Sequence, residues 1–324
     1  MMKAILVFID GTICDASQRY PLGIGMPEFY RREEMLKDAA VPGSVKCLQE
    51  LAQHYELVYI GARPVFTLPY TAEWLAQAGF PQGHICLGET QAERLALVRD
   101  LREKFDFMAG IGDRWDDNEL HLEIGCLSII LQEHAGDWAG VPQCILSYQR
   151  RQKARENERH LRGKIEGLAR VLPRLHAKYG DELWETYFQS VLQTAAATRE
   201  ERAREDRASL AGHGLNPEDL RDVAKWVEIT RAEDWENDPA FGLQDSELVE
   251  AAERRYIHRI TRCRYAELWQ EQGRPDIGYQ IHCRCDAAWW DQPAWNPDVR
   301  FEQPQTLMQG HDGCLFVQYL PDAE

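Results

Sequence analysis

The sequence has no run of about 18 apolar residues, the length that a membrane-spanning helix needs. It also has no recognisable leader, because the short apolar run after Lys3 passes into Asp10 and Gly11 without a small-residue cleavage site. Its nine cysteines are too scattered over 324 residues for a small secreted disulfide framework. We therefore expect a cytoplasmic protein with reduced thiols and without a membrane partner.

Positive charge is in short supply, with 37 Lys and Arg against 53 Asp and Glu and a formal net charge of -16. Such a balance repels a phosphate backbone, so nucleic acid is not an expected partner. The basic stretch QRRQKARENERHLRGK at 149–164 has no aromatic residues among its charges, which favours a solvated linker helix over an anion site. The expected partner is a small-molecule substrate, and a homo-oligomer remains an open alternative.

The length of 324 residues exceeds the size at which single hydrophobic cores stop growing, so two domains are expected. From Lys3 to about Tyr148, apolar runs such as AILVFI and ELVYIGA alternate with amphipathic segments. This alternation predicts parallel strands joined by crossover helices, an α/β domain at 1–148. After the linker at 149–164, helical segments precede stretches of period-two hydrophobicity, which predict an α+β domain at 165–324 with helices first and an antiparallel sheet last.

Several stretches near the C-terminus have the hydrophobic alternation of strands: IHRITRCRYAEL, GYQIHCRC, VRFEQPQTLMQ and CLFVQYL. The last two flank GHDG, which predicts a hairpin from about Val299 to Tyr319. As a strand, GYQIHCRC would place Cys283 and Cys285 on one face.

The stretch KAILVFIDGTICD at residues 3–15 has the outline of a strand and loop for phosphoryl transfer. That chemistry needs a carboxylate nucleophile at the strand end, a second acid two residues later, and a glycine and threonine that let the loop wrap the phosphate. Asp10, Gly11 and Thr12 are present, but Phe8 stands at the position of the nucleophile. A phenyl ring can neither attack phosphorus nor bind magnesium.

This stretch resembles the first motif of the haloacid dehalogenase (HAD) superfamily, particularly its polynucleotide phosphatase-like members, over roughly residues 3–135. The resemblance implies a Rossmann-type parallel sheet. It places the second motif at Gly61, which lacks a phosphate-holding hydroxyl, followed by Arg63. In place of the third motif's lysine stands Arg94, with Lys104 as a later candidate.

The fourth HAD motif is retained in GIGDRWDDNE, which contains Asp113, Asp116 and Asp117. By the resemblance, Asp10, Asp113 and Asp117 mark a vestigial magnesium site. Without the nucleophile, carboxylates at strand ends more often cap loop amides than bind metal. We expect a degenerate phosphatase domain without phosphatase activity, which has a structural or ligand-binding role.

Four cysteines gather in the final 62 residues, and acidic residues and histidines lie beside them. Three interpretations compete: a zinc site, a thiol-dependent enzyme, and buried sulfur. Tetrahedral zinc sites draw on paired spacings such as C-x-x-C, which this cluster lacks. Free cysteine is often simply buried, and Cys285 is the best candidate for that role.

A thiol enzyme uses a thiolate as its nucleophile and a nearby acid or base to move protons. A C-x-x-D pair and a D-x-C pair supply the catalytic candidates, which are Cys283, Asp286, Asp312 and Cys314. The substrate-binding candidates are their neighbours in sequence, which are Cys263, His282, Trp290 and His311. His311 is also a candidate base, although a histidine in a turn is more often simply solvated. The aromatic stretch AWWDQPAW is a candidate wall for a planar substrate, although tryptophans at this density more often pack in a core or between domains.

The order of these motifs resembles the L-2-amino-thiazoline-4-carboxylic acid hydrolase family. The matching positions are Cys263 before a YAE-type helix, Cys283 with Asp286, Asn296 with Pro297, and Gly310, Asp312, Cys314 and Phe316 in a G-x-D-x-C-x-F ending. Leu315 departs from the acidic residue that usually follows the last cysteine.

This second resemblance implies a thiol-dependent hydrolase, which adds water to the amidine carbon of a small amino-acid-derived heterocycle and cleaves a C–N bond in specialised metabolism. The alternative is a non-catalytic metal- or ligand-binding protein that uses the cysteine cluster. No cofactor is assigned, and magnesium and zinc both stay open.

Overall fold

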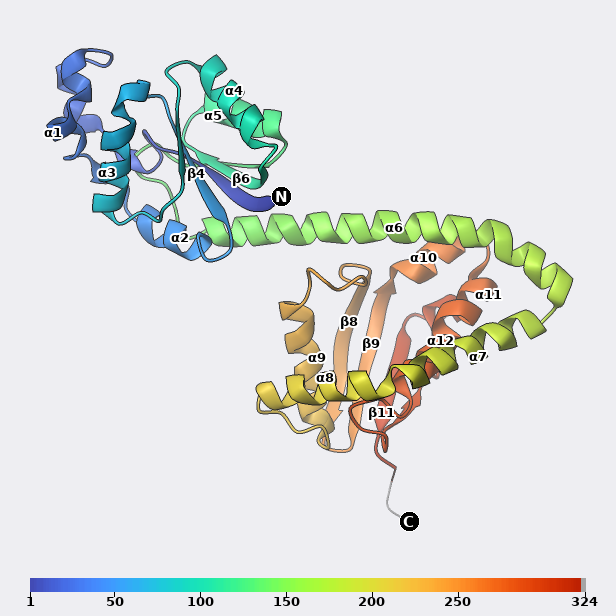
Figure 1. The fold of residues 1–324 in the computed structure, drawn as a ribbon. Helices are drawn as coiled ribbons and strands as arrows, with labels where there is room; N and C mark the ends of the chain where they lie inside the picture. The colour runs from blue at the N-terminus through green and yellow to red at the C-terminus, as the bar shows by residue number, and fades with distance from the viewer. Residues whose placement is uncertain (322–324) are drawn as a thin grey trace. The chain divides into compact units, whose positions relative to one another are not determined.

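The computed structural model describes residues 1–321 and divides into two compact units, Met1–Gln149 and a second that begins at Arg150. Helix α6 (Val141–Tyr179) begins in the first unit and continues into the second (Figure 1). The segment 149–164, expected as a linker helix, is the middle of this longer helix. Within residues 1–321, no helix is both long and apolar enough to cross a membrane.

The first unit is built on a five-stranded parallel sheet in the order β5-β4-β1-β6-β7. The strands are β1 (Met2–Phe8), β4 (Glu56–Gly61), β5 (His84–Leu87), β6 (Phe105–Gly112) and β7 (Leu127–Ile130). The connecting helices are α2 (Ser44–Leu51), α3 (Leu68–Ala78), which follows the short turn η3 (Val65–Thr67), α4 (Gln91–Leu101) and α5 (Trp115–Ile124). The α/β class expected from the alternating pattern is confirmed.

Both faces of this sheet are covered, which explains why its strands read as continuous apolar runs. Ile5 and Val7 of β1 face one core with α2 and α3, whereas Leu6 and Phe8 face the other core with α4 and α5. Phe8 is 5% exposed, and its ring packs edge-on against the buried His121 at a centroid distance of 5.5 Å. Phe8 therefore behaves as a core residue at the end of the central strand.

A small insertion follows β1 and contains a buried ion pair. It consists of β2 (Cys14–Asp15), η1 (Ser17–Leu22), η2 (Pro27–Tyr30), α1 (Arg32–Met35) and β3 (Ala39–Ala40). Arg19 donates from Nε and Nη2 to the two carboxylate oxygens of Asp38 at 2.7 and 2.6 Å, and from Nη1 to the carbonyl of Phe29. Both charged side chains are at most 1% exposed, so each depends on the other for its charge compensation.

The second unit places helices before a four-stranded antiparallel sheet, as expected for an α+β fold. After α6 come α7 (Glu182–Ala197), α8 (Arg199–Gly212) and α9 (Leu220–Glu233). The sheet order is β10-β11-β9-β8, with strands β8 (Gln244–Ala252), β9 (Arg255–Cys263), β10 (Arg300–Glu302) and β11 (Cys314–Tyr319). The expected hairpin is present, since Arg300 of β10 pairs with Tyr319 of β11, but β10 is short and a long loop connects it to β11.

The prediction of a strand at GYQIHCRC is wrong. GYQIHCRC is helical and belongs to a continuous segment of α11 (Pro275–Gly278), the π-helical turn η4 (Tyr279–Cys283) and α12 (Arg284–Trp290). It follows α10 (Arg264–Glu271), and the short turn η5 (Leu307–Gln309) precedes β11. The apolar side of this helical segment faces the main core of the unit through Ile277 and Ile281, so tertiary packing overrides the local alternation.

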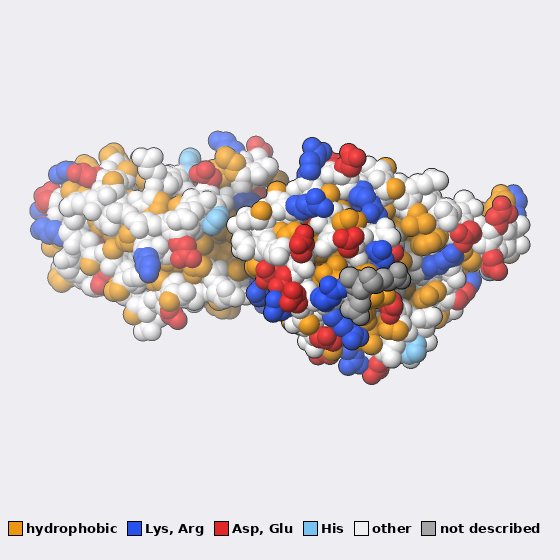
Figure 2. Space-filling view, turned by 90° about the horizontal axis from the view of Figure 1, so that it is seen from below, with side chains coloured by type: hydrophobic (Ala, Val, Ile, Leu, Met, Phe, Trp, Pro, Cys, Tyr) orange, Lys and Arg blue, Asp and Glu red, His pale blue; other side chains and the backbone are white. Residues whose placement is uncertain are grey.

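The outer surface of the second unit mixes both signs of charge. On the face seen in Figure 2, the Lys and Arg side chains of the described residues lie among Asp, Glu and hydrophobic side chains. The negative charge surplus of the sequence is therefore not gathered into one patch on this face.

We predict that Arg19→Met destabilises the first unit by about 3–5 kcal/mol, because it leaves the Asp38 carboxylate buried without its cation. Hydrogen-exchange protection of the β1 amides would measure the loss. The matched control is Arg99→Met, which removes an exposed pair with Glu123 and should cost less than about 1 kcal/mol. Equal losses in the two variants would contradict this account of the buried pair.

Candidate functional site

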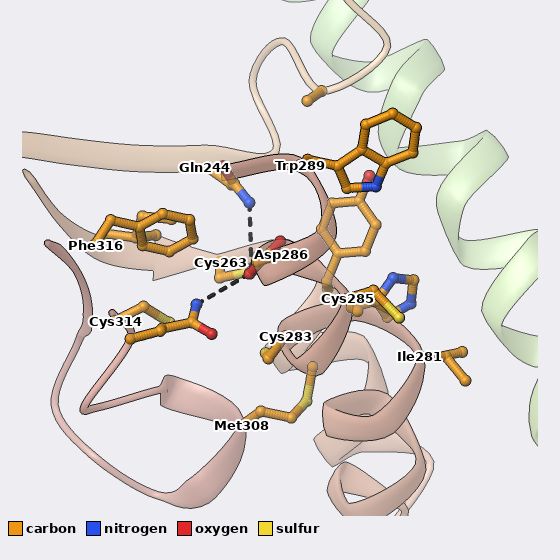
Figure 3. A pocket seen from close by; sticks show the side chains of 15 residues that line it. Gln244, Cys263, Ile281, Cys283, Cys285, Asp286, Trp289, Met308, Cys314 and Phe316 are labelled. Atoms are coloured by element: carbon orange, nitrogen blue, oxygen red, sulfur yellow. Dashed lines mark hydrogen bonds between the residues drawn. The ribbon is translucent and has the colours of Figure 1, made fainter. Parts of the chain in front are cut away.

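The second unit contains a cavity of about 260 Å3 in which the C-terminal cysteines converge. Its walls come from β9, β11, η4 and α12, and Figure 3 shows the side chains of Cys263, Cys283, Cys314 and Asp286 turned toward the same space. The remaining polar lining consists of Gln244, Tyr265, His282, Cys285 and Gln303. The structure thus brings three cysteines distant in sequence to one carboxylic acid.

Local structure explains this convergence. Cys263 is the last residue of β9 and the N-cap of α10, while Cys314 is the first residue of β11 and pairs with Ile260 on β9. Because the C-x-x-D pair lies on a helix, Cys283 and Asp286 are three residues apart and share one face. The π-helical turn that ends at Cys283 is of a kind often found at functional sites.

Asp286 is the carboxylic acid of the cavity, and its surroundings favour the protonated form. Burial raises the pKa of its carboxyl group to about 7, although Gln303 Nε2 donates a hydrogen bond to Oδ2 at 3.0 Å, which acts in the opposite direction. No positively charged side chain contributes to this shift. At neutral pH the group is therefore divided between its acid and its carboxylate, which suits proton transfer in both directions.

The cavity thiols differ in how far protein groups offset the effect of burial. Burial raises the pKa of Cys283 well above its usual value, and the negative charge of Asp286 adds to this. Burial also raises the pKa of Cys314 to about 11, against a hydrogen bond that the Leu307 amide donates to its sulfur at 3.2 Å. Cys285 has its pKa raised to about 11, and its Sγ donates to the Gln280 carbonyl at 3.6 Å.

Cys263 receives more hydrogen bonds on its sulfur than the other cavity thiols. Burial raises its pKa, the charge of Asp286 adds to this, and the net pKa stays raised, although the backbone N–H groups of Ala266 and Tyr265, in the first turn of α10, donate to its sulfur and act in the opposite direction. Gln244 Nε2 adds a long contact to Sγ at 3.9 Å (Figure 3). Helix N-terminal amides stabilise thiolates, and sequence spacing alone could not show that Cys263 occupies such a cap.

Some residues expected at the site from the sequence lie elsewhere. Asp312 has an 82% exposed side chain and pairs with Arg259 at 2.8 Å outside the cavity, and His311 is also exposed. Trp290 does not line the cavity, whereas its neighbour Trp289 does. Sequence reasoning missed Gln244 and Gln303, because nothing in their local sequence marks them as functional, and it gave Tyr265 no role although this residue is the tyrosine of the YAE-type motif.

His282 lines the cavity, as expected, but as a neutral ring. Burial lowers its pKa to about 4, and its ring packs edge-on against Tyr265 at 4.8 Å between centroids. Its Nε2 has no hydrogen-bond partner within residues 1–321. Such a ring can offer hydrogen bonds to a neutral ligand but carries no charge at neutral pH.

The loops at the carboxyl ends of β1 and β6 in the first unit, which contain Asp10, Asp113 and Asp117, do not fit magnesium. Arg63 donates to both oxygens of Asp10, the shortest contact being 2.6 Å from Nη2 to Oδ1, and also to Thr71 and Cys14. Burial raises the pKa of the Asp10 carboxyl, but the Arg63 cation more than offsets this and the net pKa is lowered. The Arg63 guanidinium group is thus hydrogen-bonded to both carboxylate oxygens of Asp10 that would otherwise ligate a metal ion. Phe8 has no atom that can serve as a ligand.

The other two carboxylates of the expected magnesium site, Asp113 and Asp117, accept hydrogen bonds from neighbouring protein groups. Thr12 Oγ1 donates to Asp113 at 2.5 Å, and Asp117 accepts from the backbone amides of Asp113 and Arg114 at 3.0 Å each. Gly11, at φ +86°, lets the loop approach Asp113, whose Oδ2 would lie 2.3 Å from a Cβ atom there. Across residues 1–321, no group of three or more His, Cys, Asp or Glu is arranged to hold a metal ion.

Comparison with known protein families finds a match within the second unit. Residues 169–317 match the model of the L-2-amino-thiazoline-4-carboxylic acid hydrolase family. The second unit is similar to these hydrolases. The matched range contains every cysteine of the cavity together with Asp286 and Gln303.

Several solved structures are similar to part of the chain. They include the Pnkp1/Rnl/Hen1 complex, at 16% identity over 42% of this chain and 47% of that chain with a TM-score of 0.34. A class C acid phosphatase from Bacillus anthracis with tungstate bound is 23% identical over 43% of this chain and 71% of that chain, at a TM-score of 0.34. A haloacid dehalogenase-like hydrolase from Streptococcus pneumoniae is 17% identical over 45% of this chain and 91% of that chain, also at 0.34.

The chain spans about half of the first of these proteins, and no curated protein matches it significantly. The resemblance of the second unit to the hydrolase family, stated from the sequence, is found again in the family-model match. We base the fold of the first unit on its own parallel strand order, β5-β4-β1-β6-β7, and not on the low TM-scores.

The raised pKa of Asp286 leads to a prediction for how the stability of the fold depends on pH. A carboxyl group that binds its proton more tightly in the folded state stabilises the fold below its unfolded pKa, and this contribution is lost as pH rises toward about 7. Asp286→Asn should therefore gain stability relative to the wild type between pH 4 and 7, by about 1–4 kcal/mol, and show a constant gain above that range. Urea unfolding at pH 4, 5.5, 7 and 8.5 would measure it. A difference independent of pH would contradict the raised pKa.

Proposed function

We propose that the second unit is a thiol-dependent hydrolase, which cleaves an amidine-type C–N bond in a small amino-acid-derived heterocycle. The observation that carries the proposal is the placement of Asp286, with a pKa raised to about 7, in one cavity with Cys263, Cys283 and Cys314. The family match of residues 169–317 supports the reaction class. The ordinary alternative, inert buried sulfur, does not account for an acid placed among the thiols without a cation.

In the first half of the proposed reaction, the Asp286 carboxylate accepts the proton of the attacking thiol. The thiolate sulfur forms a bond to the amidine carbon of the ring, and the C=N electron pair moves to nitrogen. Asp286, now protonated, returns its proton to the ring nitrogen. The lone pair of the exocyclic amidine nitrogen then forms a C=N bond to the same carbon as the ring C–N bond breaks, and a proton passes from the exocyclic nitrogen to the departing ring nitrogen, which leaves as an amine. Acid and base roles for one group are favoured when its pKa lies close to the working pH.

In the second half, water attacks the carbon that is bound to the cysteine sulfur. Asp286 takes a proton from the water, the carbon–sulfur bond to the enzyme breaks, and Asp286 returns the proton to the departing thiolate. The substrate has then gained one water, and the enzyme has regained its starting protonation. No oxidant, reductant or metal is needed.

Cys263 is the preferred nucleophile. Two backbone amides at the start of α10 stabilise its thiolate, and the charge of Asp286 has a smaller effect on its pKa than either amide. For Cys283 the charge of Asp286 is the largest effect after burial, and a single backbone amide acts against it. Cys314 receives one amide, from Leu307, and is the second choice. Gln303 fixes the orientation of Asp286 through its hydrogen bond and is a positioning residue.

The first unit has a structural or ligand-binding role in this proposal. The Arg63–Asp10 pair and the phenyl ring of Phe8 oppose phosphoryl transfer, because neither a nucleophile nor a free general acid is left at the end of β1. The buried network of Asp10, Arg63 and Cys14 stabilises the loop that would otherwise hold a phosphate.

The reaction can be tested by mass spectrometry with 2-aminothiazoline-4-carboxylate, which should gain one water in the presence of the wild type. Cys263→Ser should lower kcat by at least about 100-fold, because serine is a poorer nucleophile in this site. Asp286→Asn should lower it by about 10²–10⁴-fold. Cys144→Ser, at an exposed cysteine of the first unit, is the matched control and should leave turnover unchanged.

The same series distinguishes the nucleophiles. Loss of turnover in Cys314→Ser with full activity in Cys263→Ser would transfer the role to Cys314. Normal turnover in all of Cys263→Ser, Cys283→Ser and Cys314→Ser would rule out the thiol mechanism. Stoichiometric zinc that survives dialysis, together with no hydrolysis, would favour the binding-protein alternative.

We predict that the protein releases no phosphate from p-nitrophenyl phosphate with Mg²⁺ above the level of a heat-treated sample, because Phe8 cannot act as a nucleophile. Asp113→Ala supplies the control for trace contamination, since a contaminant's activity would persist in it. Mg²⁺-dependent release by the wild type that disappears in Asp113→Ala would overturn our account of the first unit.

A further inference from the structure

A second, larger cavity adjoins the cysteine cavity and extends it. Its volume is about 870 Å3, and Ala240, Gln244 and Trp289 line both spaces. Small-molecule sites in proteins usually measure about 300–1,000 Å3, so the cysteine cavity alone, at about 260 Å3, is small for a site and the outer space is large. The two spaces together therefore offer room for a ligand larger than one five-membered ring.

The walls of the outer cavity are unusually rich in tryptophan. They include Trp226 on α9, Trp289 and Trp290 at the end of α12, and Trp295 in the following loop, and we call this space the tryptophan vestibule. Trp226 is fixed because its Nε1 donates to Ser209 Oγ at 2.9 Å, and Arg207 donates to the Trp295 carbonyl at 3.1 Å. Rigid aromatic walls of this kind bind planar apolar groups at low entropic cost.

Most charged side chains of the vestibule already interact with other side chains or with the backbone of the protein. Arg202 lies over the Trp289 ring at 4.8 Å, and Arg231 donates to Ser246 at 2.7 Å. Asp234 accepts from the Asn237 side chain and Asp238 accepts from the Ala240 amide. Asp206 differs, since it is partly buried on α8 and accepts no hydrogen bond from the described residues. Its carboxylate, which the charge of Arg202 stabilises, is an acceptor available to a ligand.

We propose that the natural substrate carries an aromatic substituent with a hydrogen-bond donor next to the hydrolysed ring, and that this substituent occupies the tryptophan vestibule. The reacting ring lies among Cys263, Cys283 and Asp286, the link passes Gln244 and Trp289, and the donor reaches Asp206. This inference rests on the proposed function for the position of the ring. It adds a class of substrate that the small parent heterocycle does not represent.

A pair of extended probes tests the inference: 2-aminothiazoline-4-carboxylate with a 4-hydroxybenzyl group, whose O–H is the donor for Asp206, attached in one as the 4-carboxamide and in the other at the 2-amino nitrogen. The wild type should turn over at least one of them with a KM at least tenfold below that of the parent. Trp226→Leu should lower the preference, measured as the ratio of kcat/KM for the extended and parent compounds, by at least tenfold. Asp206→Ala should lower it about fivefold, and it serves as a second variant should the tryptophan substitution disturb folding.

Trp115→Leu is the matched control, because Trp115 is 75% exposed in the first unit and should not affect the preference. If the parent compound is hydrolysed but neither benzyl probe is preferred, the inference is overturned while the proposed function stands. If no compound is hydrolysed, the proposed function fails. Isothermal titration calorimetry of the probes and the parent compound then tests whether the vestibule binds the aromatic substituent. Binding of a benzyl probe at least tenfold tighter than the parent, lost in Trp226→Leu, supports it, and equal affinities reject it.

Discussion

The chemistry that we propose for the second unit depends on one constraint. Asp286 lies among thiols in a cavity whose described lining contains no Lys or Arg side chain. The carboxyl group receives a single side-chain hydrogen bond, from Gln303, and burial raises its pKa to about 7. A carboxylate so weakly supported costs folding energy at neutral pH. Proteins keep such costs mainly where a group must exchange protons, so this acid is the centre of our proposal.

The two units show how surroundings decide what a carboxylate can do. In the first unit, Asp10 contacts Arg63 through several hydrogen bonds, and its pKa is lowered. In the second unit, Asp286 has no such partner, and its pKa is raised. A permanently ionised, paired carboxylate cannot move protons at neutral pH, whereas one with a pKa near 7 can do so in both directions. This contrast places the proposed activity in the second unit.

Much of the fold could be predicted from the sequence because its signals are regular. Continuous apolar runs such as AILVFI lie in a sheet covered on both faces, and Phe8 at the nucleophile position was visible without a structure. The error at GYQIHCRC arose because a short alternating stretch fits a strand as well as a helix, and only packing of Ile277 and Ile281 against the core decides between them.

The site could be predicted only where the relevant residues are close in sequence. The pair Cys283 and Asp286 was visible as a motif, whereas the contributions of Gln244 and Gln303 depend on long-range folding. Asp312 shares a motif with Cys314, yet it follows a turn to the surface and pairs with Arg259. Asp312 precedes β11, which begins at Cys314, so the alternation of a strand does not fix its direction, and nearness in sequence does not imply a shared site.

The most direct test of this account is the reactivity of each cavity thiol toward iodoacetamide, measured by peptide mass spectrometry between pH 5 and 9. We predict that Cys263 reacts faster than Cys283, Cys285 and Cys314 below pH 8, and that Asp286→Asn changes the pH dependence of its reaction. If Cys263 reacts no faster than the other three, and its pH dependence is the same in Asp286→Asn, the proposed partnership of Cys263 and Asp286 is wrong.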